Sequence, residues 1–417
     1  WANSPWREGY ERLWHTTFTA GVGDWSISED LRHWVNDGLM ALFFLVVGLE
    51  IKRELFTGEL RDRRTAILPA IAALGGMVVP ALIYLALNAG GEGASGWGIP
   101  MATDIAFALG VLTLAARHAP SNLKPFLLTL AIVDDIGAII VIALFYSGGL
   151  TWGALGVAFG LCGLIVLLER IHVRAGAVYV VLGVGVWLAT FESGVHPTIA
   201  GVALGLLTPA VPFQRPRAVS EEAHRVADET VDDPFPPDAD AHLWLLLAGL
   251  SREAVSPLAR LEEVLHPWTS WVIVPLFALA NAGVALSGSA LREASTSPVA
   301  VGILLGLVVG KVAGISLASL LAVKTGLARL PESVRWRDLV GTAAVAGIGF
   351  TVSLFIAELA FDQAALRDTA KVGILAASLV AGLAGFLLLR SSPESIESNE
   401  VEQADVPEPA PGAAREP

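Results

Sequence analysis

Two adjacent carboxylates, Asp134 and Asp135, lie in the middle of an apolar run over residues 126–145. A run of about twenty apolar residues is long enough to cross a bilayer as a helix. A single charge at bilayer depth costs roughly 2.5–3.5 kcal/mol on insertion scales, so an ionisable pair there indicates an ion or proton site. Adjacent helical residues point about 100° apart, so the two carboxylates face different partners.

The chemistry open to such a pair is the exchange of protons and cations. An ionised carboxylate binds a hard cation through its oxygen atoms, and the same oxygens can take up a proton. Lys311, near the centre of the apolar segment 298–325, is another mid-membrane charge and a natural counter-ion for one aspartate. A buried salt bridge there would be strongly coupled to the protonation of its partner. An aspartate pair buried for packing and a snorkelling lysine are the alternatives.

Two interrupted helices are predicted near these charges. Residues 98–104 (GIPMATD) begin with a Gly-Pro signal and end in a polar Thr-Asp pair, and residues 346–351 (AGIGFT) interrupt another apolar segment. Broken helices in corresponding positions of two halves point to the site of an inverted-repeat transporter. Asp104 and Lys311 could compensate the partial charges of the opposed half-helix ends, whereas glycines that serve only helix packing are the alternative. The residues assigned to the two interruptions are Thr103, Asp104, Gly347, Gly349 and Thr351.

Further ionisable residues lie at predicted helix ends. One group follows the first apolar segment and another precedes the eighth, and side chains snorkelling to the interface are the commoner explanation for both. His196 lies at the start of an outer helix, where a structural histidine and a pH-responsive one are equally consistent with the sequence. The two groups are Glu50, Lys52, Arg53 and Glu54, and Glu262, Glu263 and His266.

Composition classifies the chain as a polytopic membrane protein. Of its 417 residues 54% are hydrophobic and 16% charged, whereas soluble domains carry about 25% charged residues. The formal charge of −13 arises in two segments: residues 220–242 hold eight acidic residues and one arginine (−7), and residues 391–417 hold seven and one (−6). The rest of the chain is therefore neutral. The single cysteine, Cys162, excludes an intrachain disulfide and a cysteine-based metal site.

Eleven apolar segments are candidates for membrane spans. Lys and Arg cluster after every second segment, first at residues 52–64, and the loops 88–97, 147–152 and 192–196 contain neither. The positive-inside rule then places the C-terminus in the cytoplasm. An odd number of spans puts residue 1 outside, so we expect one further helix upstream of it. The segments are 31–56, 66–88, 97–116, 122–147, 150–170, 174–191, 194–210, 267–287, 298–325, 337–361 and 367–390.

The remaining residues form the parts outside the 31–390 transport domain or between its spans. Residues 1–30 form an external segment, and the alternation over 17–27 predicts a small β-hairpin, with an irregular loop as the alternative. Residues 214–242 are acidic and Pro-rich, which predicts a flexible cytoplasmic loop. Residues 242–250 are too short to span and are expected at the interface or packed on the protein. The acidic composition of residues 391–417 predicts a disordered cytoplasmic tail.

The sequence closely resembles the NhaA family of bacterial Na⁺/H⁺ antiporters. The resemblance runs in order from about residue 30 to 390, and its long blocks make it specific. Glu263 departs from a histidine often found at its position in the family, and the acidic 220–242 insertion is unusual. The blocks are 36–55 (NDGLMALFFLVVGLEIKREL), 102–110 (ATDIAFALG), 131–138 (AIVDDIGA), 275–283 (PLFALANAG), 310–311 (GK) and 347–351 (GIGFT).

The resemblance implies a fold and a role for individual residues. The implied fold is a twelve-helix inverted repeat with two crossing broken helices and an external β-hairpin that joins a homodimer, and residue 1 would fall just after the first family helix. Asp135 becomes the principal carrier of Na⁺ and protons, and Asp134 its neighbour paired with Lys311. Thr103 and Asp104 belong to the helix crossing. Residues matching those linked to the cation path or pH response are Asp37, Glu50, Arg53, Glu54, Glu262 and His266.

The working hypothesis is an electrogenic antiporter of the bacterial inner membrane. Na⁺ or Li⁺ leaves while a larger number of protons enters, because both compete for the same buried aspartates. In acid the aspartates stay protonated, so activity rises with pH and serves Na⁺ and pH homeostasis. The mechanism needs no covalent intermediate, cofactor or nucleic acid, and the protein is not an enzyme.

Three other classes remain open from the residues alone. An intramembrane aspartyl protease also uses two buried aspartates, but these must face each other from different helices. A soluble all-α prenyl synthase would use Mg²⁺-binding aspartates, which the hydropathy disfavours. A passive channel is disfavoured by Lys311 at mid-membrane and by the lack of a repeated filter.

Overall fold

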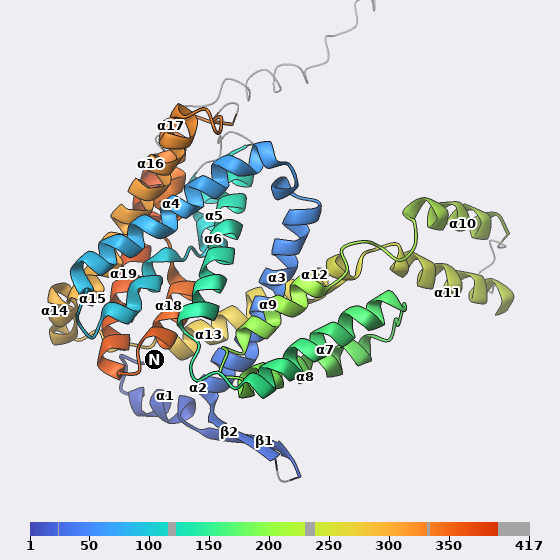
Figure 1. The fold of residues 1–417 in the computed structure, drawn as a ribbon, viewed down its shortest axis with the longest axis horizontal. Helices are drawn as coiled ribbons and strands as arrows, with labels where there is room; N and C mark the ends of the chain where they lie inside the picture. The colour runs from blue at the N-terminus through green and yellow to red at the C-terminus, as the bar shows by residue number, and fades with distance from the viewer. Residues whose placement is uncertain (24, 116–121, 230–237, 332–333, 391–417) are drawn as a thin grey trace, which may run out of the picture.

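The computed structural model is almost entirely helical in the part of the chain that it describes (Figure 1). The predicted tail, 391–417, and residues 230–237 of the predicted loop lie outside that part. Each of the eleven apolar segments predicted from the sequence contains helix. The described residues are 1–23, 25–115, 122–229, 238–331 and 334–390.

Seven helices are long and apolar enough to cross a membrane, counted over the described residues. Some of them run through consecutive elements, because a π-helical turn interrupts the α-helical pattern without ending the helix. They are α2 (Leu31–His33) with η1 (Trp34–Leu39) and α3 (Met40–Phe56); α4 (Arg63–Asn88); α6 (Leu123–Phe145); α7 (Trp152–Arg170); α12 (Pro257–Trp268) with η4 (Thr269–Ile273) and α13 (Val274–Asn281); α15 (Pro298–Leu305) with η5 (Gly306–Gly310) and α16 (Lys311–Lys324); and α19 (Ala364–Arg390).

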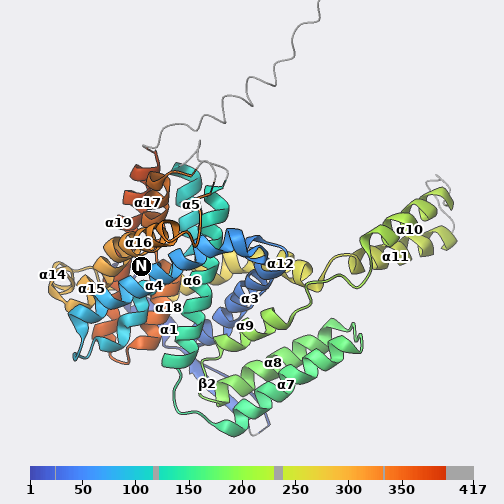
Figure 2. The same cartoon turned by 45° about the horizontal axis from the view of Figure 1, so that its top comes forward.

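Two further spans are broken, as the sequence predicts. The first consists of η3 (Ala94–Met101) and α5 (Ile105–Ala115), bent by 41°, and the second of α17 (Trp336–Val345) and α18 (Phe350–Ala360), bent by 48°. The halves cross: η3 packs on α18, and α5 packs on α17. The surrounding helices α4, α6, α16 and α19 enclose the crossing near the centre of the molecule (Figures 1 and 2).

Shorter elements complete the described chain. The predicted β-hairpin is confirmed: β1 (Thr17–Val22) pairs antiparallel with β2 (Trp25–Asp30). The hairpin lies beside α1, at the end of the molecule opposite α17 (Figure 1). The other elements are α1 (Arg7–Trp14), η2 (Glu59–Arg61), the apolar helices α8 (Gly176–Glu192) and α9 (Thr198–Leu207), α10 (Pro216–Glu229), α11 (Asp238–Glu253) and α14 (Gly288–Thr296).

The structure differs from the sequence prediction in the 214–242 segment. Instead of a flexible loop, α10 and α11 form a helical hairpin that projects from the body (Figures 1 and 2). Pro216 starts α10, where its missing N–H costs nothing. Val219 and Val226 then recur at helical spacing and pack with Leu247 of α11 in a small core. The prediction of a loop followed from the many acidic residues of this segment and did not take the helical spacing of its valines into account.

The position of Lys311 depends on a close approach of α4 and α16. A Cβ atom added at Gly314 would lie 2.1 Å from the carbonyl oxygen of Gly75, and one added at Gly75 would lie 2.3 Å from the carbonyl oxygen of Gly314. Only glycine allows the two backbones this distance. Lys311 lies one turn before Gly314, so this contact sets the depth at which its side chain enters the core.

We therefore predict that Gly314→Ala lowers the apparent melting temperature in detergent, because the new methyl group overpacks the crossing at a cost of about 1–3 kcal/mol. Gly163→Ala on α7 is the matched control, since no heavy atom lies within 4 Å of its added Cβ. Equal melting temperatures for the two variants would show that the α4–α16 contact is adaptable.

Candidate functional site

A fully buried ion pair forms the centre of the site. The Nζ atom of Lys311 lies 2.5 Å from Oδ2 of Asp134, and neither side chain is exposed. Thr103 Oγ1 lies 2.6 Å from the same carboxylate oxygen, and Lys311 Nζ also donates to Thr103 Oγ1 at 3.0 Å. Three elements, α6, α16 and the η3–α5 break, thus meet at one carboxylate.

The burial of Lys311 excludes the snorkelling alternative. Lys311 is 0% exposed and directly follows the π-helical turn η5. A π turn inserts one residue into the helical repeat and is frequent at functional sites. The ammonium group of Lys311 therefore reaches Asp134 rather than a membrane surface. Oδ1 of Asp134 has no hydrogen-bond partner among the described residues, so that half of the carboxylate stays available.

Asp104 joins the two broken helices. Its Oδ2 accepts from the Thr351 amide at 3.1 Å and from the Thr351 hydroxyl at 2.5 Å, while Oδ1 accepts from the Phe107 amide at 3.2 Å. One carboxylate thereby satisfies amides in the first turns of both α5 and α18. Anionic groups at helix N-termini are stabilising, and here one residue serves two of them.

The backbone between the two breaks is satisfied in the same way. The Asp104 amide donates to the carbonyl oxygen of Ile348 at 2.6 Å, and Thr103 Oγ1 lies 2.9 Å from the carbonyl oxygen of Ala346. The single hydroxyl proton of Thr103 can go to that carbonyl or to Asp134, but not to both. The predicted crossing residues are thus all brought together.

Gly347 and Gly349 keep this crossing compact. A Cβ atom at Gly347 would lie 2.4 Å from the carbonyl oxygen of Leu307, and one at Gly349 would lie 2.2 Å from Ser353 Oγ. Ser353 in turn donates to the carbonyl oxygen of Ile99 at 2.8 Å. The two glycines therefore meet η5 and α18 at contact distance, which explains their position in the interrupted segment.

Asp135 differs from its neighbour. It is 7% exposed, and its carboxylate makes neither a hydrogen bond nor an ion pair with any residue that the structure describes. The same helix turn thus presents one carboxylate that is held and one that is free. The free one has both oxygens open to a cation or a proton. This separation disfavours a protease, whose two aspartates must share one proton.

A pair that the sequence did not predict lies on the side toward the β-hairpin. Nε2 of His196 lies 3.4 Å from Oδ1 of Asp37, and its Nδ1 lies 2.8 Å from Thr198 Oγ1. Trp187 Nε1 donates to the carbonyl oxygen of Asp37 at 2.9 Å. Asp37 lies in the π turn η1. The structure therefore brings His196 to a carboxylate that the sequence did not assign to it.

The residues predicted for a cation path are only partly brought together. Arg53 of α3 forms an ion pair with Glu262 of α12, whereas the buried Glu54 accepts from the Glu59 amide at 2.7 Å. Glu50, one turn before Glu54, is half-buried and makes no ion pair within the described part of the chain. The His266 side chain is exposed and does not join this group.

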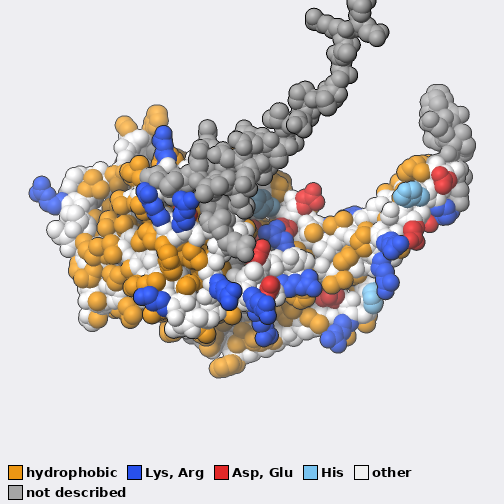
Figure 3. Space-filling view, turned by 90° about the horizontal axis from the view of Figure 1, so that it is seen from above, with side chains coloured by type: hydrophobic (Ala, Val, Ile, Leu, Met, Phe, Trp, Pro, Cys, Tyr) orange, Lys and Arg blue, Asp and Glu red, His pale blue; other side chains and the backbone are white. Residues whose placement is uncertain are grey.

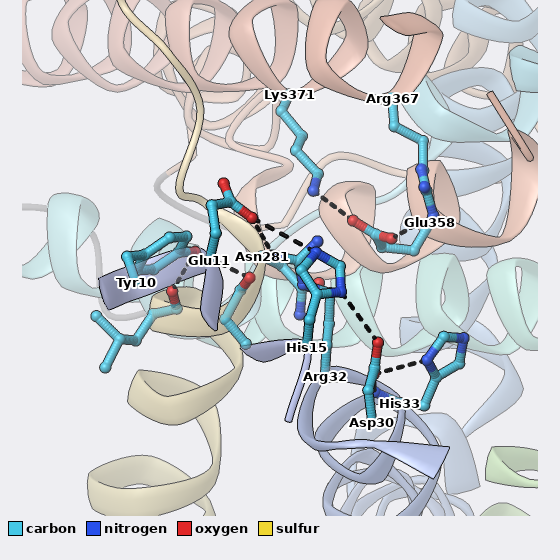
Figure 4. Close-up of polar contacts among 12 residues, drawn as sticks. Tyr10, Glu11, His15, Asp30, Arg32, His33, Asn281, Glu358, Arg367 and Lys371 are labelled. Carbon is cyan, nitrogen blue, oxygen red and sulfur yellow. Dashed lines mark hydrogen bonds and ion pairs between the residues drawn. The ribbon is translucent and has the colours of Figure 1, made fainter. Parts of the chain in front are cut away.

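A second buried ion cluster, which the sequence did not predict, is shown in Figure 4. Glu358 of α18 lies 2.5 Å from Lys371 and 3.3 Å from Arg367, both on α19. Glu358 and Lys371 have side-chain exposures of 7% and 4%. Both charges interrupt segments predicted to be apolar, and that signal could have revealed the pair.

The N-terminal segment packs over this cluster. The Tyr10 hydroxyl oxygen lies 2.8 Å from the carbonyl oxygen of Leu279 and 3.0 Å from that of Ala280, at the end of α13, and it can donate its one proton to either. Burial raises the pKa of the Tyr10 phenol, so it remains a donor. Arg32 lies 3.8 Å from Glu11 of α1. In Figure 4 Tyr10 and Glu11 of α1 lie to the left of Glu358, Arg367 and Lys371, and Arg32 lies below Lys371.

Comparison with known proteins gives consistent matches over nearly the whole chain. The sequence profile described as Na⁺/H⁺ antiporter 1 matches residues 1–389. The Na⁺/H⁺ antiporter NhaA 2 of Sorangium cellulosum is 48% identical over 398 residues, covering 94% of this chain and 85% of the relative. The NhaA 3 protein of Frankia alni is 49% identical over 390 residues (94% and 83%), and the NhaA protein of Syntrophobacter fumaroxidans is 47% identical over 397 (93% and 84%).

The second ion cluster generates a stability prediction. Lys371→Met leaves Glu358 buried with only the more exposed Arg367, so it costs about 3–5 kcal/mol, whereas Glu358→Gln combined with Lys371→Met costs less. Thermal unfolding in detergent, carried out on both single variants and the double variant, gives the coupling. Arg217→Met, at the exposed pair with Glu221, is the control and leaves the midpoint unchanged. Strictly additive effects would contradict the buried pairing.

Proposed function

The chain belongs to the Na⁺/H⁺ antiporter 1 (NhaA) family of multi-pass membrane transporters, and from that membership we propose how it exchanges the two ions. Asp135 carries Na⁺ or Li⁺ outward and protons inward, because both compete for its carboxylate. The observation that carries this assignment is the difference between the two aspartates. Asp134 is held by Lys311 and Thr103, whereas Asp135 has no partner in the described part of the chain.

The proposed exchange is electrogenic, with more protons entering than Na⁺ leaving. One proton replacing one Na⁺ on Asp135 would move no net charge, so a second titrating group is needed. The pair of Asp134 and Lys311 is buried beside Asp135 and holds a dissociable proton. Cation entry next to Lys311 opposes its charge, since Coulomb interactions are strong where water is excluded. We assign the second proton to this pair.

The broken helices supply the second part of the proposal, which is alternating access. The Asp104 carboxylate and the Thr103 hydroxyl link the half-helices by side-chain hydrogen bonds rather than by continuous helix. Such links can be exchanged without unfolding a span. The crossing therefore acts as the hinge beside Asp135.

We further propose the orientation and assembly. Lys and Arg side chains are spread over the face seen in Figure 3, which looks from above onto the end of the molecule where Figure 1 labels α17. We infer that this face and the C-terminus are cytoplasmic in the bacterial inner membrane. The hairpin of β1 and β2 then lies outside. Each of its two strands has one edge unpaired in the described chain, which supports a homodimer formed through it.

The pH response follows from competition, with a contribution from ionisable groups at both surfaces. The pair of His196 and Asp37 lies toward the outside and the pair of Arg53 and Glu262 toward the cytoplasm. Both pairs join different helices, so a change in their charge would bias the packing of those helices. The exposed His266 is the least favoured of the predicted responsive residues.

Replacing the proposed carrier tests the assignment. Asp135→Asn keeps the size of the side chain but cannot ionise, so it abolishes the Na⁺-dependent dissipation of ΔpH in everted vesicles. Asp362→Asn, an exposed position between α18 and α19, is the matched control and retains exchange. Exchange by Asp135→Asn at a similar protein level would overturn the site.

Competition also fixes the pH dependence of Na⁺ binding. Since protonated Asp135 cannot bind Na⁺, the apparent KM for Na⁺ in proteoliposomes rises as pH falls, by about tenfold per pH unit for each competing proton. Saturating Na⁺ restores the rate at moderately acidic pH. A KM that stays constant while the maximal rate changes would instead indicate a separate pH switch.

A further inference from the structure

The projecting hairpin of α10 and α11 has an apolar face that its own packing does not use. Inside the hairpin, α11 contributes one stripe, at Leu243, Leu247 and Leu250, to the core with Val219 and Val226 of α10. At about 100° per residue these three α11 positions occupy a narrow arc of the helix. The rest of the α11 surface is therefore free of that contact.

A second stripe of α11 is apolar and exposed. Trp244 is 48% exposed and Leu245 73%, and the small residues Ala241 and Ala248 are also exposed. Helical spacing places these four within an arc of about 100° that faces away from the hairpin core. A solvated helix normally keeps such an arc polar. An exposed apolar patch of this kind marks an interaction surface.

The base of the hairpin is fixed to the ends of membrane helices. The Gln214 amide donates to the carbonyl oxygen of Glu253 at 3.1 Å, and Glu253 forms an ion pair with Arg174 in the turn between α7 and α8. The Arg174 guanidinium also lies over the ring of Phe213, 5.8 Å from its centroid. The hairpin thus leaves the body where α7 and α8 end, at the level of the membrane surface.

The direction of the hairpin completes the placement. In Figure 1 α10 and α11 run across the page and away from the body, whereas α3 and α6 run up it; Figure 2 shows the same projection. Helix α7 lies at the rim, since only 11% of its apolar window is buried. The hairpin therefore extends along the membrane plane, past the rim of the helices and over lipid.

We propose that α11 lies in the headgroup layer of the surrounding bilayer, with the face of Trp244 and Leu245 turned into the lipid. Figures 1 and 2 both show α11 as the helix of the hairpin nearer to the rim helix α7, which favours the bilayer beside α7 over another protein as its occupant. Tryptophan is enriched at the headgroup level. Arg252 lies within the same arc and can bind lipid phosphates. The acidic side of α10 then faces water, as in an interfacial amphipathic helix.

Site-directed spin labelling of the full chain tests this. With Cys162→Ala as background, a nitroxide is placed at Leu245→Cys and, as the matched control, at Glu221→Cys on the exposed face of α10. The protein is reconstituted in phosphatidylcholine–phosphatidylglycerol vesicles. We expect the ratio of oxygen to Ni-EDDA collision rates at 245 to exceed that at 221 several-fold, because oxygen concentrates in lipid and the nickel complex in water.

Two outcomes would overturn the proposal. Equal Ni-EDDA collision rates at both positions would place α11 in water, and protection of position 245 from both reagents would show that protein, such as a second copy of the chain, covers it. Trp244→Cys in the same arc gives an independent reading. Retained Na⁺/H⁺ exchange by each labelled variant shows that the labelled chain is folded.

Discussion

The arrangement rests on holding one ion pair, Asp134 with Lys311, where water reaches neither side chain. Each charge alone would cost several kcal/mol at that depth, so the pair is stable only while its geometry is kept. Several local features serve that geometry. The π turn η5 aims Lys311, the close contact of Gly75 with Gly314 sets its depth, and Thr103 binds both partners. These features position the buried ion pair, and a helix that faced only lipid would not need them.

The helix crossing depends on the residues next to this pair. Breaking two spans inside a membrane frees amide and carbonyl groups that lipid cannot satisfy. Thr103 and Asp104 satisfy both breaks, through Ala346, Ile348 and Thr351. Because Thr103 also contacts Asp134, any movement of the half-helices changes the hydrogen bonding of the ion pair. The Thr103 hydroxyl therefore couples the position of the broken helices to the hydrogen bonding of the Asp134–Lys311 pair.

Much of this could be predicted from the sequence, because membrane insertion makes charges and breaks conspicuous. The positions of Asp134, Asp135, Lys311 and the two interruptions were all visible as exceptions to an apolar pattern. Partners were harder to predict than positions. The Glu358–Lys371 pair joins residues whose proximity no local pattern reveals, and His196 meets Asp37 across more than 150 residues. These contacts are set by how the helices pack.

The α10 helix was missed for a different reason. Its acidic composition suggested a disordered segment, but helix formation needs only the recurrence of Val219 and Val226 at the right spacing and a partner helix to cover them. The acidic residues of α10 give the composition of its solvated face, whereas the spacing of its valines determines which face is buried.

In the proposed mechanism, the adjacency of the two aspartates lets one carboxylate be held while the other binds and releases ions. Successive residues on a helix face about 100° apart, so Asp134 can be fixed by Lys311 while Asp135 stays open on the same turn. The two remain close enough for the charge state of one to be felt by the other, since burial leaves little screening between them. A cation bound to Asp135, as proposed above, would therefore act on Lys311 without contact. Two aspartates one turn apart would stack on a single face and compete for the lysine.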